Sequence, residues 1–199
     1  PCVHRLLFQG DPVTIHDISG DTRPPKDHEK PDGRYLAYGT SITQGAVASL
    51  PHLTYVHRAG RHAGLDPLNL GTGGSAWCEP AIADYLAQRD DWDVMTLGLS
   101  VNMLGAGFDL ESFEQRTRYL IETIADANPG ASVLPITIFP LTDDLTDTTR
   151  YEDAKAPPEQ FRDRLRAVVA DLDRPNVRLV EGPDLLEDPT GLSNDLCHP

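Results

Sequence analysis

Lysine is almost missing from this sequence. Only Lys26, Lys30 and Lys155 occur in 199 residues, whereas 31 residues are Asp or Glu and the formal net charge is −14. A field of that sign repels nucleic acids and anionic membrane surfaces, which are themselves negative. The composition therefore argues against both as partners. An acid-rich, lysine-poor chain is also what we expect of a cytosolic protein from a halophile.

Long apolar runs and metal-binding spacings are lacking as well. No stretch approaches the roughly 18 to 20 apolar residues of a membrane span, and no charged-then-apolar leader opens the chain. The three cysteines, Cys2, Cys78 and Cys197, show no metal-ligand spacing. His57 and His62 lie five residues apart and do not share a helix face. We therefore expect a cytoplasmic protein with free thiols, no metal and no cofactor.

What the sequence does contain is an alternation of strand-like and helix-like segments. Runs of β-type residues predict strands at 35–39, 66–70, 92–97, 132–139 and 176–180. Apolar residues at helical spacing and end signals predict helices at 54–63, 79–88, 110–128 and 158–172, with a long polar loop at 140–157. This alternation indicates a parallel sheet with helices on both faces. The predicted fold class is therefore α/β, a three-layer α/β/α flavodoxin-like sandwich.

The N-terminal part has a different character. Residues 3–18 predict a β-hairpin with its turn at 9–12. A lone hairpin is marginal in water, so we expect residues 1–19 to end an N-terminal β-domain whose earlier strands precede this sequence. Prolines and charged residues predict a linker at 20–33. The α/β domain then spans 34–199.

Ser41 follows the first predicted strand, which stops at a glycine. The carboxyl ends of parallel strands meet at one edge of a sheet, the usual place for ligands in α/β proteins. Three further loops, at 71–75, 98–107 and 187–199, are predicted to reach the same edge. The topology therefore gathers their polar groups around Ser41.

These loops hold the parts of a serine nucleophile site. A serine hydroxyl becomes reactive when a base, most often histidine, takes its proton, and His198 lies in the last loop. Asp195 precedes it by three residues, a spacing that places both side chains on one side of a turn. Its carboxylate can then fix the imidazole tautomer. Backbone N–H groups at 71–74 and the Asn102 amide offer donors for an oxyanion.

Each feature also has a plainer explanation. Ser41 fits a turn hydroxyl, His198 a solvated side chain near a terminus, and Asn102 a helix or turn cap. The glycine-rich loop 71–75 also fits a phosphate cradle, although the acidic charge counts against it. The Gly-x-Ser-x-Gly elbow of common α/β-hydrolases is not present, because Thr43 stands at its second glycine.

Two cysteines and a tryptophan lie close to these loops. A Cys197–His198 pair is disfavoured because adjacent side chains point apart. Trp77 and Cys78 follow the glycine-rich loop. They either line an acyl or leaving-group pocket or are buried beneath the start of a helix. We take Trp77 as a candidate substrate-binding residue.

The order and spacing of four segments resemble the sequence blocks of the SGNH, or GDSL-like, hydrolase family. The matching segments are Gly39-Thr40-Ser41-Ile42-Thr43, Asn69-Leu70-Gly71-Thr72-Gly73-Gly74, Ser100-Val101-Asn102-Met103 and Asp195-Leu196-Cys197-His198-Pro199. The first and last are specific, the middle two are looser, and together they cover roughly residues 34–199. Thr40 and Met103 stand where the family pattern has aspartate, which indicates an outlying branch.

The resemblance implies a serine ester hydrolase that works through an acyl-enzyme without a cofactor. Ser41 would be the nucleophile, His198 the base and Asp195 its orienting carboxylate. The N–H groups of Ser41 and Gly74 and the Asn102 amide would hold the oxyanion. The implied substrates are esters of small molecules or carbohydrates. The implied branch carries an N-terminal β-sandwich, and the family has a helix after its last block, so we expect this chain to lack its C-terminal helix.

Two alternatives stay open. The same serine machinery could transfer the acyl group to another alcohol, which would make the protein an acyltransferase. A non-catalytic module that binds a sugar or a phosphate is the other alternative.

Overall fold

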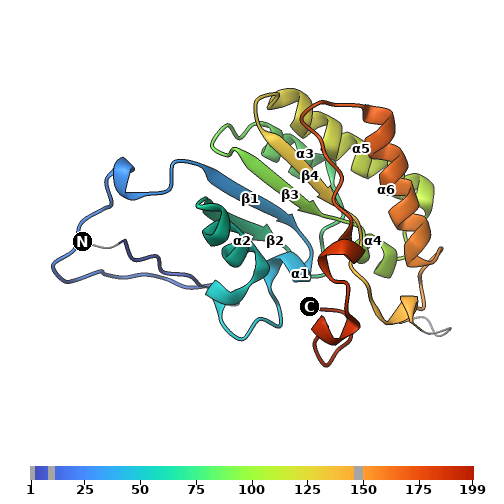
Figure 1. Ribbon diagram of the computed structural model, residues 1–199, viewed down its shortest axis with the longest axis horizontal. Helices are drawn as coiled ribbons and strands as arrows, with labels where there is room; N and C mark the ends of the chain where they lie inside the picture. Colours follow the sequence, from blue (N-terminus) through green and yellow to red (C-terminus); the bar gives the residue numbers. More distant parts are fainter. Residues whose placement is uncertain (1–2, 9–11, 146–149) are drawn as a thin grey trace.

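A parallel β-sheet forms the centre of the protein (Figure 1). The computed structural model describes residues 3–8, 12–145 and 150–199, and the sheet has the strand order β2-β1-β3-β4. The strands are β1 (Arg34–Gly39), β2 (Asp66–Gly71), β3 (Val94–Gly98) and β4 (Ser132–Ile136). Every pairing is parallel, and Gly39 lies beside both Gly71 and Gly98 at the carboxyl edge. This confirms the predicted α/β class.

The segment 176–180, predicted as a fifth strand, lies beside β4 but forms only isolated parallel bridges with it. Val133 and Thr137 of this edge donate their N–H groups to the segment at 2.9 and 3.0 Å. Pro135 lies between them and has no N–H, so the ladder is interrupted in the middle. The predicted position is therefore confirmed, whereas a regular strand is not formed.

Local signals set the ends of the helices. The helices are α1 (Ser41–Gln44), α2 (Tyr55–Ala63), α3 (Pro80–Ala87), α4 (Val101–Gly105), α5 (Leu110–Ala127), α6 (Pro158–Leu172) and α7 (Gly182–Leu185). Thr54 caps α2 by accepting from the His57 N–H, and Gly64 ends the helix in a left-handed conformation. Within the residues described, none of the helices combines the length and apolar character that a membrane crossing requires.

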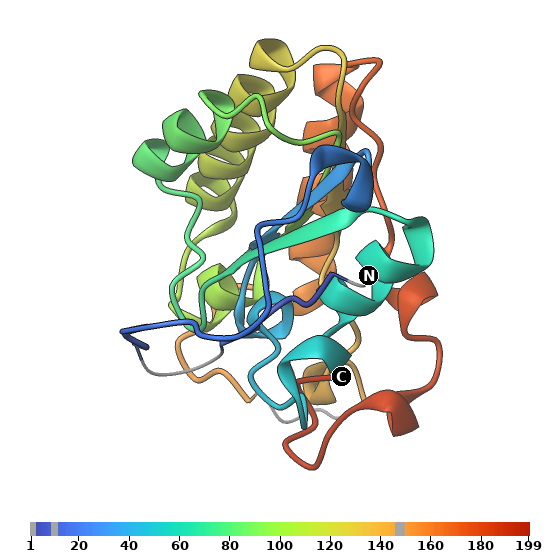
Figure 2. The same ribbon diagram turned by 90° about the vertical axis from the view of Figure 1, so that its left-hand side faces the viewer.

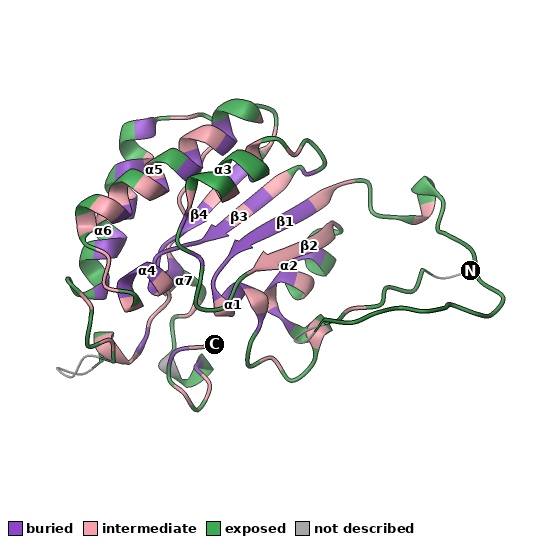
Figure 3. Ribbon diagram, turned by 180° about the vertical axis from the view of Figure 1, so that it is seen from behind, coloured by how far each residue is buried: buried purple, intermediate pink, exposed green. Residues whose placement is uncertain are grey.

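Side chains of β1 alternate between two cores, as a strand period of two requires. Leu36 and Tyr38 belong to the larger core, together with side chains of α3, α5 and α6. Tyr35 and Ala37 face the other way, where Val56 of α2 covers them. Figure 2 shows α3 and α5 on one side of the sheet and α2 on the other, and Figure 3 shows β1 buried between the layers. The three predicted layers are present.

The predicted hairpin at 3–18 is not observed. Residues 3–8 and 12–18 form no strand, and the centre of the predicted turn, 9–11, lies outside the described residues, as does Cys2. Most apolar side chains here are at least half exposed: Val3, Leu6, Phe8, Val13, Ile15 and Ile18. Without a core against which to bury them, two short strands gain too little to offset their ordering entropy.

The predicted linker at 20–33 is largely exposed and contains a 3-10 helix at Asp27–Glu29. Figure 1 shows the N-terminal part of the chain reaching away from the α/β layers. Arg5 returns to the domain, where it forms an ion pair with Asp66 at the start of β2.

Candidate active site

Ser41 is the first residue of α1, which begins just after β1 ends. Thr40 is the N-cap, and its hydroxyl accepts a hydrogen bond from the Ile42 N–H at 3.3 Å. Thr40 is buried, so a small hydroxyl that caps the helix suits a position where the family pattern has an aspartate. This cap leaves Ser41 half-buried at the carboxyl edge of the sheet.

A chain of hydrogen bonds links Ser41 to the end of the sequence. Ser41 Oγ lies 2.7 Å from His198 Nε2. His198 Nδ1 lies 2.5 Å from Asp195 Oδ2. Figure 1 shows the C-terminal segment below the ends of the strands, next to α1. The structure thus brings the three predicted side chains together, with the histidine in the middle.

Several donors hold Asp195 in its ionised form. Its Oδ1 accepts from the backbone N–H groups of Cys197 and His198, both at 3.0 Å, and from the Ser193 hydroxyl at 2.7 Å. Desolvation raises the pKa of Asp195, but these hydrogen bonds, with that of the His198 amide the largest, outweigh it and hold the pKa well below its usual range. A carboxylate at Nδ1 keeps a proton there, so Nε2 is free to accept from Ser41.

The polar loop before α6 holds the C-terminal loop in place. Thr142 Oγ1 donates to the Leu196 carbonyl at 2.9 Å, and Arg150 donates to another carbonyl of the same loop. The Tyr151 hydroxyl lies 3.3 Å from Cys197 Sγ, so this thiol is buried against Tyr151. None of these contacts is predictable from the sequence, because they join distant segments and leave no local spacing to detect. Ser193 is also absent from the predicted site, although a hydroxyl two residues before Asp195 is a local signal.

The glycine-rich loop after β2 passes very close to α1. A Cβ at Gly71 would lie 2.1 Å from the Gln44 backbone nitrogen, so glycine is required there. A Cβ at Gly73 would lie 3.5 Å from Ser41 Cβ, which places this part of the loop against the serine. Gly74 has a φ of 71° and open space at its Cα. Within the described chain neither the Gly73 nor the Gly74 N–H donates, so both are available.

Asn102 lies in α4, shortly after β3. Its Oδ1 accepts from the Ala76 N–H at 3.2 Å, which ties the amide to the glycine-rich loop and leaves its NH₂ group to donate. Ser100, just before α4, has a φ of 92°, a strained backbone of the kind that clusters at functional sites. Met103, where the family pattern has an aspartate, is fully buried, so an apolar side chain suits it.

Trp77 and Cys78 are neighbours in the chain with opposite environments. Trp77 is 37% exposed, and its ring centroid lies 6.4 Å from that of Phe108. Cys78 is fully buried, and desolvation raises the pKa of its thiol to about 12. Cys78 is therefore a core residue, and Trp77 is available to a ligand.

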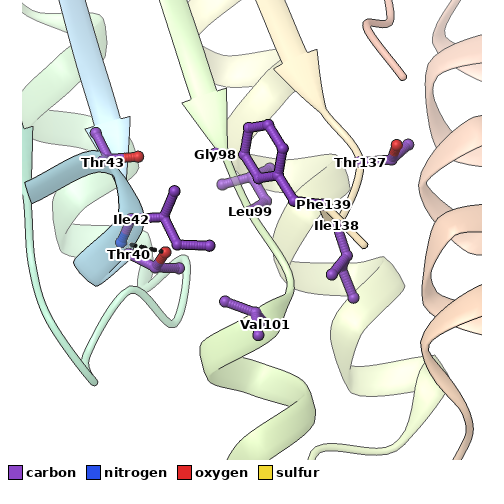
Figure 4. A pocket seen from close by; sticks show the side chains of 9 residues that line it. All are labelled: Thr40, Ile42, Thr43, Gly98, Leu99, Val101, Thr137, Ile138 and Phe139. Atoms are coloured by element: carbon purple, nitrogen blue, oxygen red, sulfur yellow. Dashed lines mark hydrogen bonds between the residues drawn. The ribbon is translucent and has the colours of Figure 1, made fainter. Parts of the chain in front are cut away.

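A pocket lies between α1 and the strand ends. Figure 4 shows the side chains that line it: Thr40, Ile42, Thr43, Gly98, Leu99, Val101, Thr137, Ile138 and Phe139. The lining takes residues on both sides of Ser41 in sequence but not Ser41 itself.

Metal ligands do not gather at this edge. In the parts of the chain that the structure describes, no three His, Cys, Asp or Glu side chains are placed to hold a metal ion. His57 Nδ1 lies 2.8 Å from the Thr54 hydroxyl at the start of α2. The chemistry open to the site is that of a hydroxyl beside an imidazole, with free amide donors close by.

Comparisons with known proteins bear on the family and the fold of the chain. Residues 33–199 match the GDSL-like lipase/acylhydrolase family. A comparison with curated protein sequences found no match. Among solved structures, the protein resembles a salicylyl-acyltransferase from a tetracycline biosynthetic pathway, with 19% identity over 84% of this chain and 49% of that chain and a TM-score of 0.71.

Two esterases have a similar fold. AlinE4, an SGNH-hydrolase family esterase, is 18% identical over 84% of this chain and 86% of its own, with a TM-score of 0.60. A family 3 carbohydrate esterase from Clostridium thermocellum is 19% identical over 83% and 86%, with a TM-score of 0.61.

The structural matches differ in how much of each protein they cover. This chain spans about half the length of the acyltransferase and of a matched protein from Bacteroides ovatus, 49% and 48%. At these identities the solved structures show the α/β SGNH-hydrolase fold. The family match takes in most of the sequence, from the strand before Ser41 to the last residue. The chain therefore belongs to the GDSL-like lipase/acylhydrolase family.

Proposed function

We propose that the protein is a serine ester hydrolase that works through an acyl-enzyme. The distance of 2.7 Å between Ser41 Oγ and His198 Nε2 carries this proposal, together with Asp195 on the other ring nitrogen. A hydroxyl, an imidazole and a carboxylate in this order allow the hydroxyl proton to move to the base while the oxygen attacks a carbonyl.

The reaction proceeds in two halves. Ser41 Oγ attacks the ester carbonyl carbon, and its proton passes to His198 Nε2. The C–O bond to the alcohol then breaks, and the alcohol leaves with that proton. Water attacks the acyl-enzyme by the same path, which releases the carboxylic acid and restores the Ser41 hydroxyl.

Negative charge develops on the carbonyl oxygen in both halves. The N–H groups of Ser41 and Gly74 and the Asn102 NH₂ group are its proposed donors. Removal of one such donor commonly costs about 3 to 4 kcal/mol of transition-state stabilisation. The Gly73 N–H is a further candidate, because this residue lies against Ser41.

We propose esters of small molecules or carbohydrates as the substrates. Membership of an esterase family supports this class, as does the fold shared with a family 3 carbohydrate esterase. The exposed face of Trp77 offers a surface for a ring of the substrate.

An acyltransferase is the second candidate. It would use the same acyl-enzyme and an alcohol in place of water. The fold shared with a salicylyl-acyltransferase, at a TM-score of 0.71, supports this second candidate. Turnover in the presence of added alcohols distinguishes the two, because a transferase releases a new ester and a hydrolase releases the acid.

The test is hydrolysis of p-nitrophenyl acetate by the wild type and by Ser41→Ala. The wild type is expected to release p-nitrophenol catalytically, and Ser41→Ala is expected to lose the activity by a factor of about 10³ or more. Ser132→Ala, which removes an exposed hydroxyl at the start of β4, is the matched control. Equal activity in Ser41→Ala and Ser132→Ala would contradict the proposal.

A further inference from the structure

Arg116, in α5, has no acidic partner in the described part of the chain. Within the described residues it forms no ion pair, although the protein has 31 acidic residues against 17 basic ones. Arg118, two residues further along the same helix, forms ion pairs with both Glu114 and Asp171. Arg116 therefore keeps a positive charge that no described carboxylate pairs with, in a protein whose net charge is negative.

Two aromatic rings accompany this charge. The Arg116 guanidinium lies over the Phe108 ring, 4.9 Å from its centroid, and Nη1 donates to the Trp77 carbonyl at 3.0 Å. The rings of Trp77 and Phe108 lie 6.4 Å apart with an interplanar angle of 39°. Toward the residues that the structure describes, Arg116 uses one of its five guanidinium N–H groups, so the others can bind a ligand.

The cluster of Trp77, Phe108 and Arg116 lies beside the proposed oxyanion donors. The glycine-rich loop runs from Gly73, which lies against Ser41, to Ala76, whose N–H donates to Asn102. Trp77 is the next residue of that loop. Phe108 follows closely on α4, the helix that carries Asn102. The same two segments thus build both the donors and the cluster.

We propose that this cluster is a subsite for an anionic aromatic group of the ester substrate. An aromatic ring stacks on the exposed Trp77, and a carboxylate on that ring pairs with Arg116. Glu79, the acidic residue nearest to Trp77 in the sequence, forms no ion pair with Arg116. A substrate carboxylate would supply the missing partner. The inference rests on the proposed function, because it places the subsite next to Ser41.

The anionic ring could belong to the acyl group or to the alcohol, and two pairs of esters distinguish these sources. Monomethyl terephthalate against methyl benzoate tests an anionic acyl group. 4-Carboxyphenyl acetate against phenyl acetate tests an anionic leaving group. The readout is the ratio of kcat/KM for the anionic ester to kcat/KM for its neutral counterpart, in the wild type, Arg116→Gln and the matched control Arg118→Gln.

We expect Arg116→Gln to lower this ratio about tenfold in at least one pair, because a charge-assisted hydrogen bond is lost. Arg118→Gln is expected to keep the wild-type ratio, which separates a local effect from a change in overall charge. Trp77→Ala is expected to lower kcat/KM for the anionic ester about three- to tenfold. Equal ratios in the wild type and Arg116→Gln for both pairs would overturn the subsite.

A binding measurement tests the subsite independently of catalysis by Ser41. Binding of monomethyl terephthalate and 4-carboxyphenyl acetate to Ser41→Ala is followed by tryptophan fluorescence. We expect saturable binding, with Kd raised about tenfold when Arg116→Gln is added and unchanged when Arg118→Gln is added. Binding with this pattern supports the subsite even if Ser41 proves inert. Failure to bind, or equal Kd in all variants, overturns it even if the esterase is active.

Discussion

The side-chain oxygen and the side-chain NH₂ group of Asn102 have separate roles. Its oxygen accepts from Ala76, and its NH₂ group is left to donate. Asn102→Asp keeps the acceptor and removes the donor in a side chain of the same shape. We expect kcat to fall about 10²- to 10³-fold, because an oxyanion donor is lost and a negative charge is added. Steady-state kinetics with p-nitrophenyl acetate measures the effect.

The thermal unfolding midpoint serves as the control for that variant. It is expected to change little, because the contact with Ala76 is retained. Wild-type kcat in Asn102→Asp would show that this amide does not act on the oxyanion.

Asp195 is expected to contribute stability that depends on pH. Its folded pKa is lowered, so its contribution is fully present above the unfolded value of about 3.9 and is lost as the pH falls toward the folded value. Asp195→Asn lacks this contribution. We therefore expect the difference in unfolding free energy between the wild type and Asp195→Asn to be constant from pH 7 to about pH 5 and to shrink below about pH 4. Urea unfolding at several pH values measures this difference. A difference that grows in acid would show that the folded state does not lower the pKa of Asp195.

At the scale of elements, Tyr151 joins two parts of the site. Its hydroxyl contacts Cys197, next to His198, and a Cβ at Gly105 of α4 would lie 2.9 Å from its ring. Tyr151→Phe keeps the ring and removes the hydroxyl. We expect kcat to fall about three- to tenfold with little change in KM, because the loop that carries His198 is held less firmly.

Tyr119→Phe is the matched control for this variant, since it removes an exposed tyrosine hydroxyl that donates to Asp84. The two variants are compared by steady-state kinetics. Equal kcat values for both would show that the Tyr151 hydroxyl does not position His198.

The elements also show how far sequence reasoning reaches. Thr54 and Gly64 carry local end signals, so α2 is predictable from them. The hairpin at 3–18 and the strand at 176–180 depend on what lies beside them: the first has no core to cover, and the second meets Pro135. Local patterns do not contain that information.

The candidate site, like the fold, is predictable from the sequence only in part. Ser41 and Asn102 follow strands, so the topology alone sends them to one edge, and Asp195 precedes His198 by a turn-like spacing. The contact of Tyr151 with Cys197 depends on how two loops fold back on each other. No residue type or spacing predicts such a contact.

At the scale of the whole molecule, the net charge of −14 is the dominant electrostatic feature. Repulsion between carboxylates opposes the compact state, and salt stabilises the fold by screening this repulsion. Salt also screens the arginine–carboxylate pairs, which destabilises the fold. Because acidic residues are in excess, we expect the screening of carboxylate repulsion to dominate. The unfolding midpoint should therefore rise by several degrees between about 0.1 and 1 M NaCl. Differential scanning calorimetry measures this shift, and a falling midpoint would mean that the ion pairs matter more.

Covalent labelling of Ser41 tests directly whether it is the nucleophile. A fluorophosphonate reacts with an activated serine, and mass spectrometry of the digested protein locates the adduct. We expect one adduct on the wild type, on the peptide that contains Ser41, and none on Ser41→Ala. Labelling that persists in Ser41→Ala, or an adduct on another residue of the wild type, would show that Ser41 is not the nucleophile.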